Sequence, residues 1–101
     1  MNPRFLHIIN SKKPVVVDFY AEWCESCKQV PSILKEVKSE LRSNVKIVKV
    51  DVDKNPLIVS QFQVQSIPTV IVFKNGKPCW KGVGLHQAHE IKSALLEHIN
   101  G

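Results

Sequence analysis

The stretch VVVDFYAEWCESCK, residues 15–28, joins an apolar run to a carboxylate and a pair of cysteines. Its beginning is apolar on both faces apart from Asp18, which is typical of a central strand covered on both sides. An ionised carboxylate is costly to bury there unless a partner compensates its charge. Cys24 and Cys27 follow, with two residues between them. The stretch therefore predicts a buried acid directly before a cysteine pair.

Helical and strand patterns alternate along the chain. Asn2 and Pro3 are suited to cap and open a first helix, and Asn55-Pro56 to do the same for a later one. Asn75-Gly76 is the strongest short hairpin signal. Pro31 falls inside the long helical pattern, where we expect it to kink the helix rather than end it. In chain order we expect helix 3–10, strand 15–20, helix 24–41, strand 45–52, helix 56–62, strands 69–73 and 77–83, and helix 87–99.

This order of elements predicts an α/β fold. A helix joins the first two strands, so these strands should be parallel, with a right-handed crossover. The last two strands should form an antiparallel hairpin on the same sheet. A chain of 101 residues can bury a single core, so we expect residues 1–101 to form one domain.

Composition and charge are those of a globular protein and argue against nucleic-acid or membrane binding. Hydrophobic residues make up 44% of the chain and charged residues 23%, which is ordinary for a globular domain. The net charge is +5, but the lysines are dispersed, so we do not expect nucleic-acid binding. No apolar run approaches the roughly 20 residues that span a membrane, and the start lacks the pattern of a signal peptide. We expect a cytoplasmic protein without membrane association.

The three cysteines limit the chemistry further. An odd count argues against a disulfide framework, and a close pair is typical of either half a metal site or a redox pair. The four histidines show no spacing that would complete a zinc site, and we place His86 and His89 on the last helix, away from the pair. We expect no metal. Cys79 is expected to be a packing residue or an inert thiol.

The placement of the cysteine pair suits thiol–disulfide exchange. Cys24 is expected at the carboxyl end of the first strand and the start of the long helix, where free amides and the helix dipole favour a thiolate. Cys27 is one turn later and shielded. Thiolate Cys24 would attack a target disulfide, a mixed disulfide would form, and Cys27 would then displace the product.

Five motifs together resemble the thioredoxin family over nearly the whole chain. They are VDFYAEWC (17–24), the Cys24-x-x-Cys27-Lys28 pattern, KVDVDKNP (49–56), SIPTVIVFKNGK (66–77) and Gly84 before the last helix. The resemblance implies a thioredoxin-like fold. The family usually has an extra edge strand before the first helix, but the residues before Val15 leave little room for it. We therefore expect a mixed four-stranded sheet in the order 2-1-3-4, flanked by four helices.

The resemblance also implies roles for residues around the cysteine pair, which would cycle between a dithiol and a Cys24–Cys27 disulfide. Asp18 would be the proton acceptor and donor for Cys27, and burial would raise the pKa of its carboxyl toward the range of such exchange. Lys49 would lie close to Asp18 and temper that shift. The substrate-binding residues implied by the family are Trp23, Ile67, Pro68 with a cis peptide bond, and Gly84.

The chain departs from the usual family pattern at several positions. Glu25 and Ser26 stand between the cysteines, where typical thioredoxins have Gly-Pro. We expect Ser26 to offer a donor to the Cys24 thiolate and Glu25 to repel it weakly, which predicts a less reducing potential. Pro31 is one position earlier than the family's helix proline. Tyr20 replaces a tryptophan of many bacterial thioredoxins and is expected mainly to pack.

The leading hypothesis is a thiol–disulfide oxidoreductase that reduces protein disulfides. It would receive electrons from a thioredoxin reductase-type donor, act on protein disulfide clients as a monomer, and need no cofactor. One alternative is an isomerase or oxidant-leaning relative with few clients. Another is a thioredoxin-fold binding subunit that keeps the cysteines without turnover.

Overall fold

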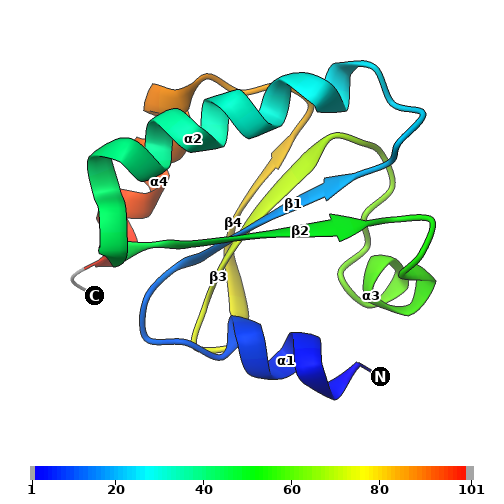
Figure 1. The fold of residues 1–101 in the computed structure, drawn as a ribbon. Coiled ribbons are helices and arrows are strands. Elements are labelled where there is room, and N and C mark those ends of the chain that lie inside the picture. Colours follow the sequence, from blue (N-terminus) through cyan, green and yellow to red (C-terminus); the bar gives the residue numbers. More distant parts are fainter. Residues whose placement is uncertain (1, 100–101) are drawn as a thin grey trace.

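The computed structural model describes residues 2–99 as a four-stranded sheet with helices on both faces (Figure 1). The strands are β1 (Val15–Tyr20), β2 (Lys46–Asp51), β3 (Thr69–Lys74) and β4 (Lys77–Val83). The helices are α1 (Pro3–Ile9), α2 (Val30–Leu41), α3 (Pro56–Gln61) and α4 (Ala88–Ile99), with 3-10 helices η1 (Ser26–Gln29) and η2 (Arg42–Asn44). Apart from the start of the long helix, every boundary lies within one residue of its expected position. None of the helices in this range is long and apolar enough to cross a membrane.

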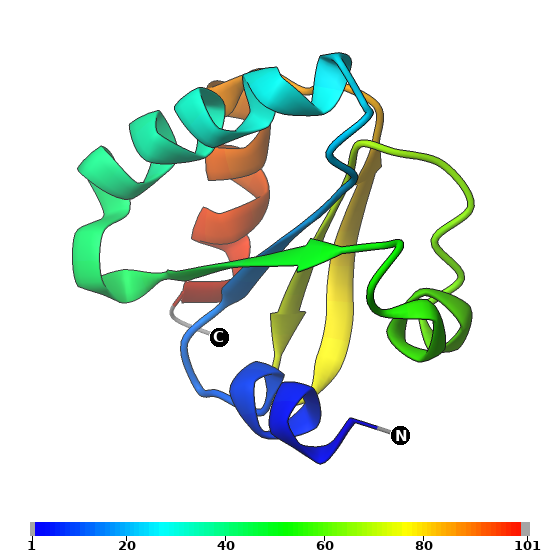
Figure 2. The same ribbon diagram turned by 45° about the vertical axis from the view of Figure 1, so that its right-hand side comes forward.

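The strand order is β2-β1-β3-β4, which confirms the expected topology. β1 pairs in parallel with β2 and antiparallel with β3, and β3 and β4 form the antiparallel hairpin. Figure 2 shows α2 and α4 on one face of the sheet, with α1 and α3 on the other side. Within residues 2–99 no strand precedes α1, so the sheet lacks the family's usual edge strand, as expected.

The central strand β1 supplies both cores, because successive side chains of a strand point to opposite faces. Val15, Val17 and Phe19 belong to the core beneath α1 and α3. Val16 belongs to the core beneath α2 and α4. The same alternation places Asp18 on the face of α2. The acid is therefore directed toward the helix that follows the cysteine pair.

The short helix α1 is held by its cap and its aromatic packing. Asn2 Oδ1 accepts a hydrogen bond of 3.1 Å from the amide of Phe5, as its predicted capping role requires. Phe5 and Ile9 are buried. The Phe5 ring lies 5.9 Å from the ring of Phe62 and 6.0 Å from that of Phe73, centroid to centroid. A helix this short is unstable alone, so its stability derives from this packing.

The predicted hairpin turn is present and fixes the end of the sheet nearest α1. Asn75 and Gly76 both have positive φ angles, 53° and 81°, as a tight two-residue turn requires. The amide of Asn75 donates to the carbonyl of Ser11, and that of Gly76 to the carbonyl of Ile9. The turn is therefore tied to the last residue of α1 and to the segment between α1 and β1.

Cys79 occupies an irregularity in the hairpin. The register runs from Val72 opposite Trp80 to Phe73 opposite Pro78, which leaves Cys79 as the extra residue. Its thiol is partly buried, packs against the α2–α4 core and donates to the carbonyl of Val72 at 3.4 Å. Burial raises the pKa of this thiol, which disfavours the reactive thiolate.

The start of the long helix differs from the expectation. The helical segment begins as a 3-10 turn at Ser26–Gln29 and becomes α-helical only at Val30. Pro31 therefore lies in the first turn of α2 rather than inside it, where its missing amide donor costs no helical hydrogen bond. The expectation that Pro31 lies inside the α-helix was wrong, and Cys24 lies before the helical segment rather than at its first residue.

The cap of α3 also differs in detail. Asn55 occupies the N-cap position and Pro56 opens the helix, as predicted, but the Asn55 side chain makes no capping hydrogen bond. Its amide instead donates to the backbone carbonyl of Asp51 at 2.9 Å. The side chain therefore stabilises the loop after β2 rather than the helix end.

We predict that Phe5→Ala lowers the free energy of unfolding by about 3 kcal/mol, because it removes a buried ring shared by the α1 packing. Chemical denaturation of the oxidised protein measures the change. Arg4→Ala, on an exposed position of the same helix, is the matched control and should stay within about 0.5 kcal/mol of the parent. Equal effects of the two changes would show that α1 does not support the core.

Candidate active site

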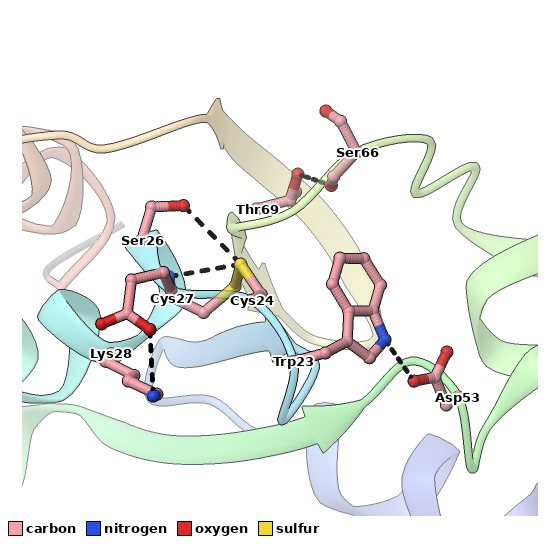
Figure 3. The surroundings of a disulfide bond; sticks show 9 residues. Trp23, Cys24, Ser26, Cys27, Lys28, Asp53, Ser66 and Thr69 are labelled. Atoms are coloured by element: carbon pink, nitrogen blue, oxygen red, sulfur yellow. Dashed lines mark hydrogen bonds and ion pairs between the residues drawn. A yellow bond between two sulfur atoms is a disulfide. The ribbon is translucent and has the colours of Figure 1, made fainter.

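A disulfide between Cys24 and Cys27 lies just beyond the carboxyl end of β1, with the two Cα atoms 5.3 Å apart (Figure 3). Cys24 belongs to the connecting loop, and Cys27 belongs to the 3-10 turn. Both cysteines are buried, and Ala21 packs with them. The pair is therefore formed as the resemblance implied.

Two donors are directed at the sulfur of Cys24. The backbone amide of Cys27 donates to Cys24 Sγ at 3.3 Å, and Ser26 Oγ lies 3.6 Å from the same sulfur (Figure 3). When Cys24 is a thiolate, the hydroxyl of Ser26 can act only as donor toward it. Hydrogen bonds to a charged acceptor are stronger than neutral ones, so this turn favours the thiolate. The 3-10 turn thus supplies the donors that we expected from the start of an α-helix.

Glu25 is engaged by an ion pair that sequence reasoning missed. Its carboxylate accepts a hydrogen bond of 3.1 Å from Lys28 Nζ, and both side chains are exposed. An exposed pair of this kind contributes little to stability. It does offset the negative charge beside Cys24, so the repulsion expected of Glu25 is weakened further.

Asp18 is the buried acid that the sequence predicted. The residue is 1% exposed, and within residues 2–99 no hydrogen-bond donor reaches its Oδ1 atom. Burial raises the pKa of its carboxyl from 3.8 to about 6, and the positive charge of Lys49 opposes this rise. Asp18 and Cys27 line the same cavity of about 340 Å³. The acid and the second cysteine are therefore brought together.

Lys49 lies where the parallel pairing of β1 and β2 puts it, with its Cα opposite that of Asp18. Its ammonium group is 4.6 Å from the centroid of the Tyr20 ring. This distance is typical of a cation–π contact. Lys49 therefore borders the same cavity as Asp18, but its charge lies over an aromatic ring.

Trp23 stands out from the surface beside the disulfide and is 72% exposed. Its indole Nε1 donates to Asp53 Oδ2 at 2.8 Å, which fixes the orientation of an otherwise free ring (Figure 3). Sequence reasoning did not single out Asp53. Its only signal is its place in KVDVDKNP, just after β2, and that does not reveal a partner thirty residues away in the chain.

The segment before β3 borders the disulfide from another direction. The Ile67–Pro68 peptide bond is cis, as the resemblance implied, and Ile67 packs against the cysteine pair and Ala21. The amide of Gly84 donates to the carbonyl of Pro68 at 2.8 Å. Gly84 has a φ of 84°, a conformation that other residues rarely adopt. The segments of Trp23 and of Ile67–Pro68 therefore border the disulfide, and Gly84 is hydrogen-bonded to the second of them.

The position expected for the two histidines was wrong in part, because His89 lies on α4 as expected but neither residue lies away from the cysteine pair. His86 precedes α4, and both His86 and His89 line a groove with Gln29 and Ser32, at the end of the molecule that carries the cysteine pair. The reason is that the start of α4 lies beside the start of α2 (Figure 2). Within residues 2–99 no three histidine, cysteine or acidic side chains form a group that could hold a metal.

We predict that Asp18→Asn raises the free energy of unfolding by about 2 kcal/mol at neutral pH, because the folded parent must bury a charged carboxyl. Its pKa is higher in the folded than in the unfolded protein. In the parent, the free-energy cost of burying the ionised carboxyl is therefore absent below about pH 4 and grows as the pH rises through about 6. Denaturation curves at pH 4 and 7 measure this.

The difference between the variant and its parent should shrink at the lower pH. An equal difference at both pH values would mean that ionisation of Asp18 is not the cause. Thr69→Ser, a conservative change at another buried polar residue, is the control and should show no such pH dependence.

Comparison with known proteins agrees with this geometry. The family model described as Thioredoxin matches residues 2–97. A thioredoxin of Rickettsia bellii is 45% identical over 93 residues, which are 92% of this chain and 85% of the relative. A bifunctional thioredoxin reductase/thioredoxin of Mycobacterium leprae is 44% identical over 96 residues, 95% of this chain and 20% of the relative.

Solved structures agree as well. A mutant thioredoxin from Halobacterium salinarum superposes with a TM-score of 0.85 at 25% identity, covering 98% of this chain and 87% of that one. Fold, cysteine pair and relatives together identify a thiol–disulfide oxidoreductase, and the chain belongs to the thioredoxin family.

Proposed function

We propose that this oxidoreductase reduces disulfides of client proteins, with Cys24 as nucleophile, Cys27 as resolving cysteine and Asp18 as proton acceptor. The observation that carries the proposal is the shared cavity of Asp18 and Cys27, next to a sulfur of Cys24 that already has two donors. The sulfur of Cys24, supported by donors, is suited to attack the client, and the sulfur of Cys27, close to the acid, is suited to displace it.

In the first step the Cys24 thiolate attacks one sulfur of the client disulfide. A bond forms between Cys24 and that sulfur, and the other client sulfur leaves as a thiolate. In the second step the Cys27 thiol gives its proton to the Asp18 carboxylate and attacks Cys24 Sγ. The remaining client thiolate leaves, and two electrons have passed to the client while the Cys24–Cys27 disulfide forms.

Asp18 suits this proton transfer because of its environment. A carboxyl with its ordinary pKa would be a poor base for a thiol at neutral pH, whereas burial brings the pKa of Asp18 to about 6. The carboxyl is then ionised at neutral pH and still basic enough to exchange a proton. The same group would return the proton to Cys27 when the disulfide is reduced again.

The client would bind across the exposed surface beside the disulfide. Trp23 offers an exposed apolar ring, oriented by Asp53. The segment with Ile67 and Pro68 would offer backbone groups to an extended client chain, and Gly84 leaves space because nothing lies within 4 Å of the position of an added Cβ. These features suit loop-borne or unfolded clients.

The proposed electron donor is a thioredoxin reductase-type enzyme. The Mycobacterium leprae relative supports this, since by its name it joins a thioredoxin reductase and a thioredoxin in one protein. We propose the cytoplasm as the compartment and a monomer as the acting form. The unpaired thiol of Cys79 fits a reducing compartment, where thiols persist.

One observation favours the oxidant-leaning alternative. The contact between Ser26 and Cys24 stabilises the thiolate, and whatever stabilises the reduced form makes the protein a stronger oxidant. Turnover of a generic protein disulfide with a dithiol donor distinguishes an enzyme from a binding subunit without turnover. If the protein disulfide were reduced no faster than in the uncatalysed reaction, the chain would be a binding subunit rather than an enzyme.

We predict that Cys27→Ser attacks a protein disulfide and then stalls as a mixed disulfide, because nothing displaces the client. Cys24→Ser is the matched control and should trap nothing. Non-reducing electrophoresis and intact mass measurement detect the adduct. If alkylation of the reduced parent at neutral pH modified Cys27 or Cys79 faster than Cys24, the assignment of the nucleophile would be wrong.

We predict that Ser26→Pro makes the protein more reducing by tens of millivolts, where 30 mV corresponds to about 1.4 kcal/mol. The change removes the hydroxyl that lies beside Cys24 Sγ. Redox equilibration against a glutathione buffer measures the potential. Glu25→Gln is the control and should have a smaller effect, because Lys28 already offsets the charge of Glu25. A Ser26→Pro variant no more reducing than the parent would show that Ser26 does not support the thiolate.

A further inference from the structure

The ring of Tyr20 borders the cavity of the buried acid but has no part in the thiol chemistry. Tyr20 is the last residue of β1, two positions after Asp18, so both side chains point to the same face of the sheet. It lines the cavity of about 340 Å³ together with Asp18, Cys27 and Lys49. The ring therefore lies where it can influence the charges around the acid.

Lys49 has two possible partners in this cavity. The strand register sets its Cα opposite that of Asp18, so the carboxylate is a neighbour in the sheet. Its ammonium group nevertheless lies 4.6 Å from the centroid of the Tyr20 ring. Within residues 2–99, Asp18 Oδ1 receives no hydrogen bond from Lys49 or from any other group. The lysine thus contacts the ring and leaves this oxygen unpaired.

We propose that the Tyr20 ring is a positioning group that holds the Lys49 ammonium off the Asp18 carboxylate. An ammonium in direct contact would stabilise the carboxylate and make it a weaker base. The attraction between a cation and the face of an aromatic ring competes with that contact. The importance of this for catalysis rests on the proposed role of Asp18 as proton acceptor.

Two of the other lysines that line the cavities around Asp18 have partners of their own. Lys28 is paired with Glu25, and Lys38 donates to the carbonyl of Val45. On β3, the residue opposite Asp18 is the uncharged Val70. Lys49 is the charge that opposes the rise in the pKa of Asp18. The ionisable side chains that line the two cavities around Asp18 are Tyr20, Glu22, Cys27, Lys28, Lys35, Lys38 and Lys49.

The test is the titration of the Asp18 carboxyl, followed by carbon NMR in the oxidised protein. Tyr20→Leu should lower its midpoint by about half a pH unit, the size expected for loss of one cation–π contact. Tyr20→Phe keeps the ring face and should titrate like the parent. If Tyr20→Leu does not fold, Tyr20→Met serves as the second variant without a ring. A midpoint that stays or rises without the ring would overturn the proposal.

A double-variant cycle separates this role from simple shielding of the cavity. Removing the ring also admits water, which by itself would lower the midpoint. In a Lys49→Met background the effect of Tyr20→Leu should be much smaller, because only the contribution of water remains and there is no ammonium to redirect. A shift of the same size in that background would mean that the ring acts by excluding water, and the proposal would be wrong.

The titration requires no turnover, so it can fail independently of the proposed function. The rate at which Cys27 resolves a mixed disulfide is measured separately in the same variants. If the midpoint moves as expected and the pH dependence of this rate does not follow, the positioning by Tyr20 stands and the proton role of Asp18 is wrong. If neither the midpoint of Asp18 nor the pH dependence of this rate changes, the proposed positioning of Lys49 by Tyr20 is wrong.

Discussion

The burial of the Asp18 carboxyl within β1 is the constraint on which the site depends. β1 supplies apolar side chains to the cores on both faces of the sheet, and the same apolar surroundings desolvate the acid. Desolvation raises the pKa of Asp18 into the range of proton exchange at neutral pH, and it also costs stability. Folding and the proposed proton transfer would therefore place opposite demands on this residue, a conflict that is common at catalytic sites.

The remaining parts of the site are positioned relative to this strand. The loop and 3-10 turn after β1 bring Cys27 to the cavity of Asp18 and direct two donors at Cys24. β2 brings Lys49 alongside, and the segment before β3 places Ile67 against the disulfide. Each segment supplies one feature, which is a hydrogen-bond donor, a charge or an apolar contact with the disulfide. The chemistry follows from their meeting at one end of the sheet.

Much of this arrangement could be predicted from the sequence. Strand alternation, the caps and the Asn75-Gly76 turn act locally, so they indicated nearly every element, and the connection lengths with the family resemblance gave the sheet order. The proximity of Asp18 and Lys49 was implied by the family resemblance, and the parallel pairing of β1 with β2 produces it in the structure. The contacts of Trp23 with Asp53 and of Lys49 with Tyr20 could not be predicted, because they depend on side-chain conformations and on tertiary placement. The 3-10 start of the long helix was missed since local periodicity does not distinguish it from an α-helical turn.

The pH dependence of the step in which Cys27 resolves a mixed disulfide tests the central claim most directly. Single-turnover measurement after rapid mixing of the reduced protein with enough excess client to make attack by Cys24 fast isolates this step. We predict that its rate rises with pH through an inflection near 6, as the carboxyl of Asp18 becomes able to accept the proton. The inflection should disappear in Asp18→Asn. The same inflection in that variant would contradict the account.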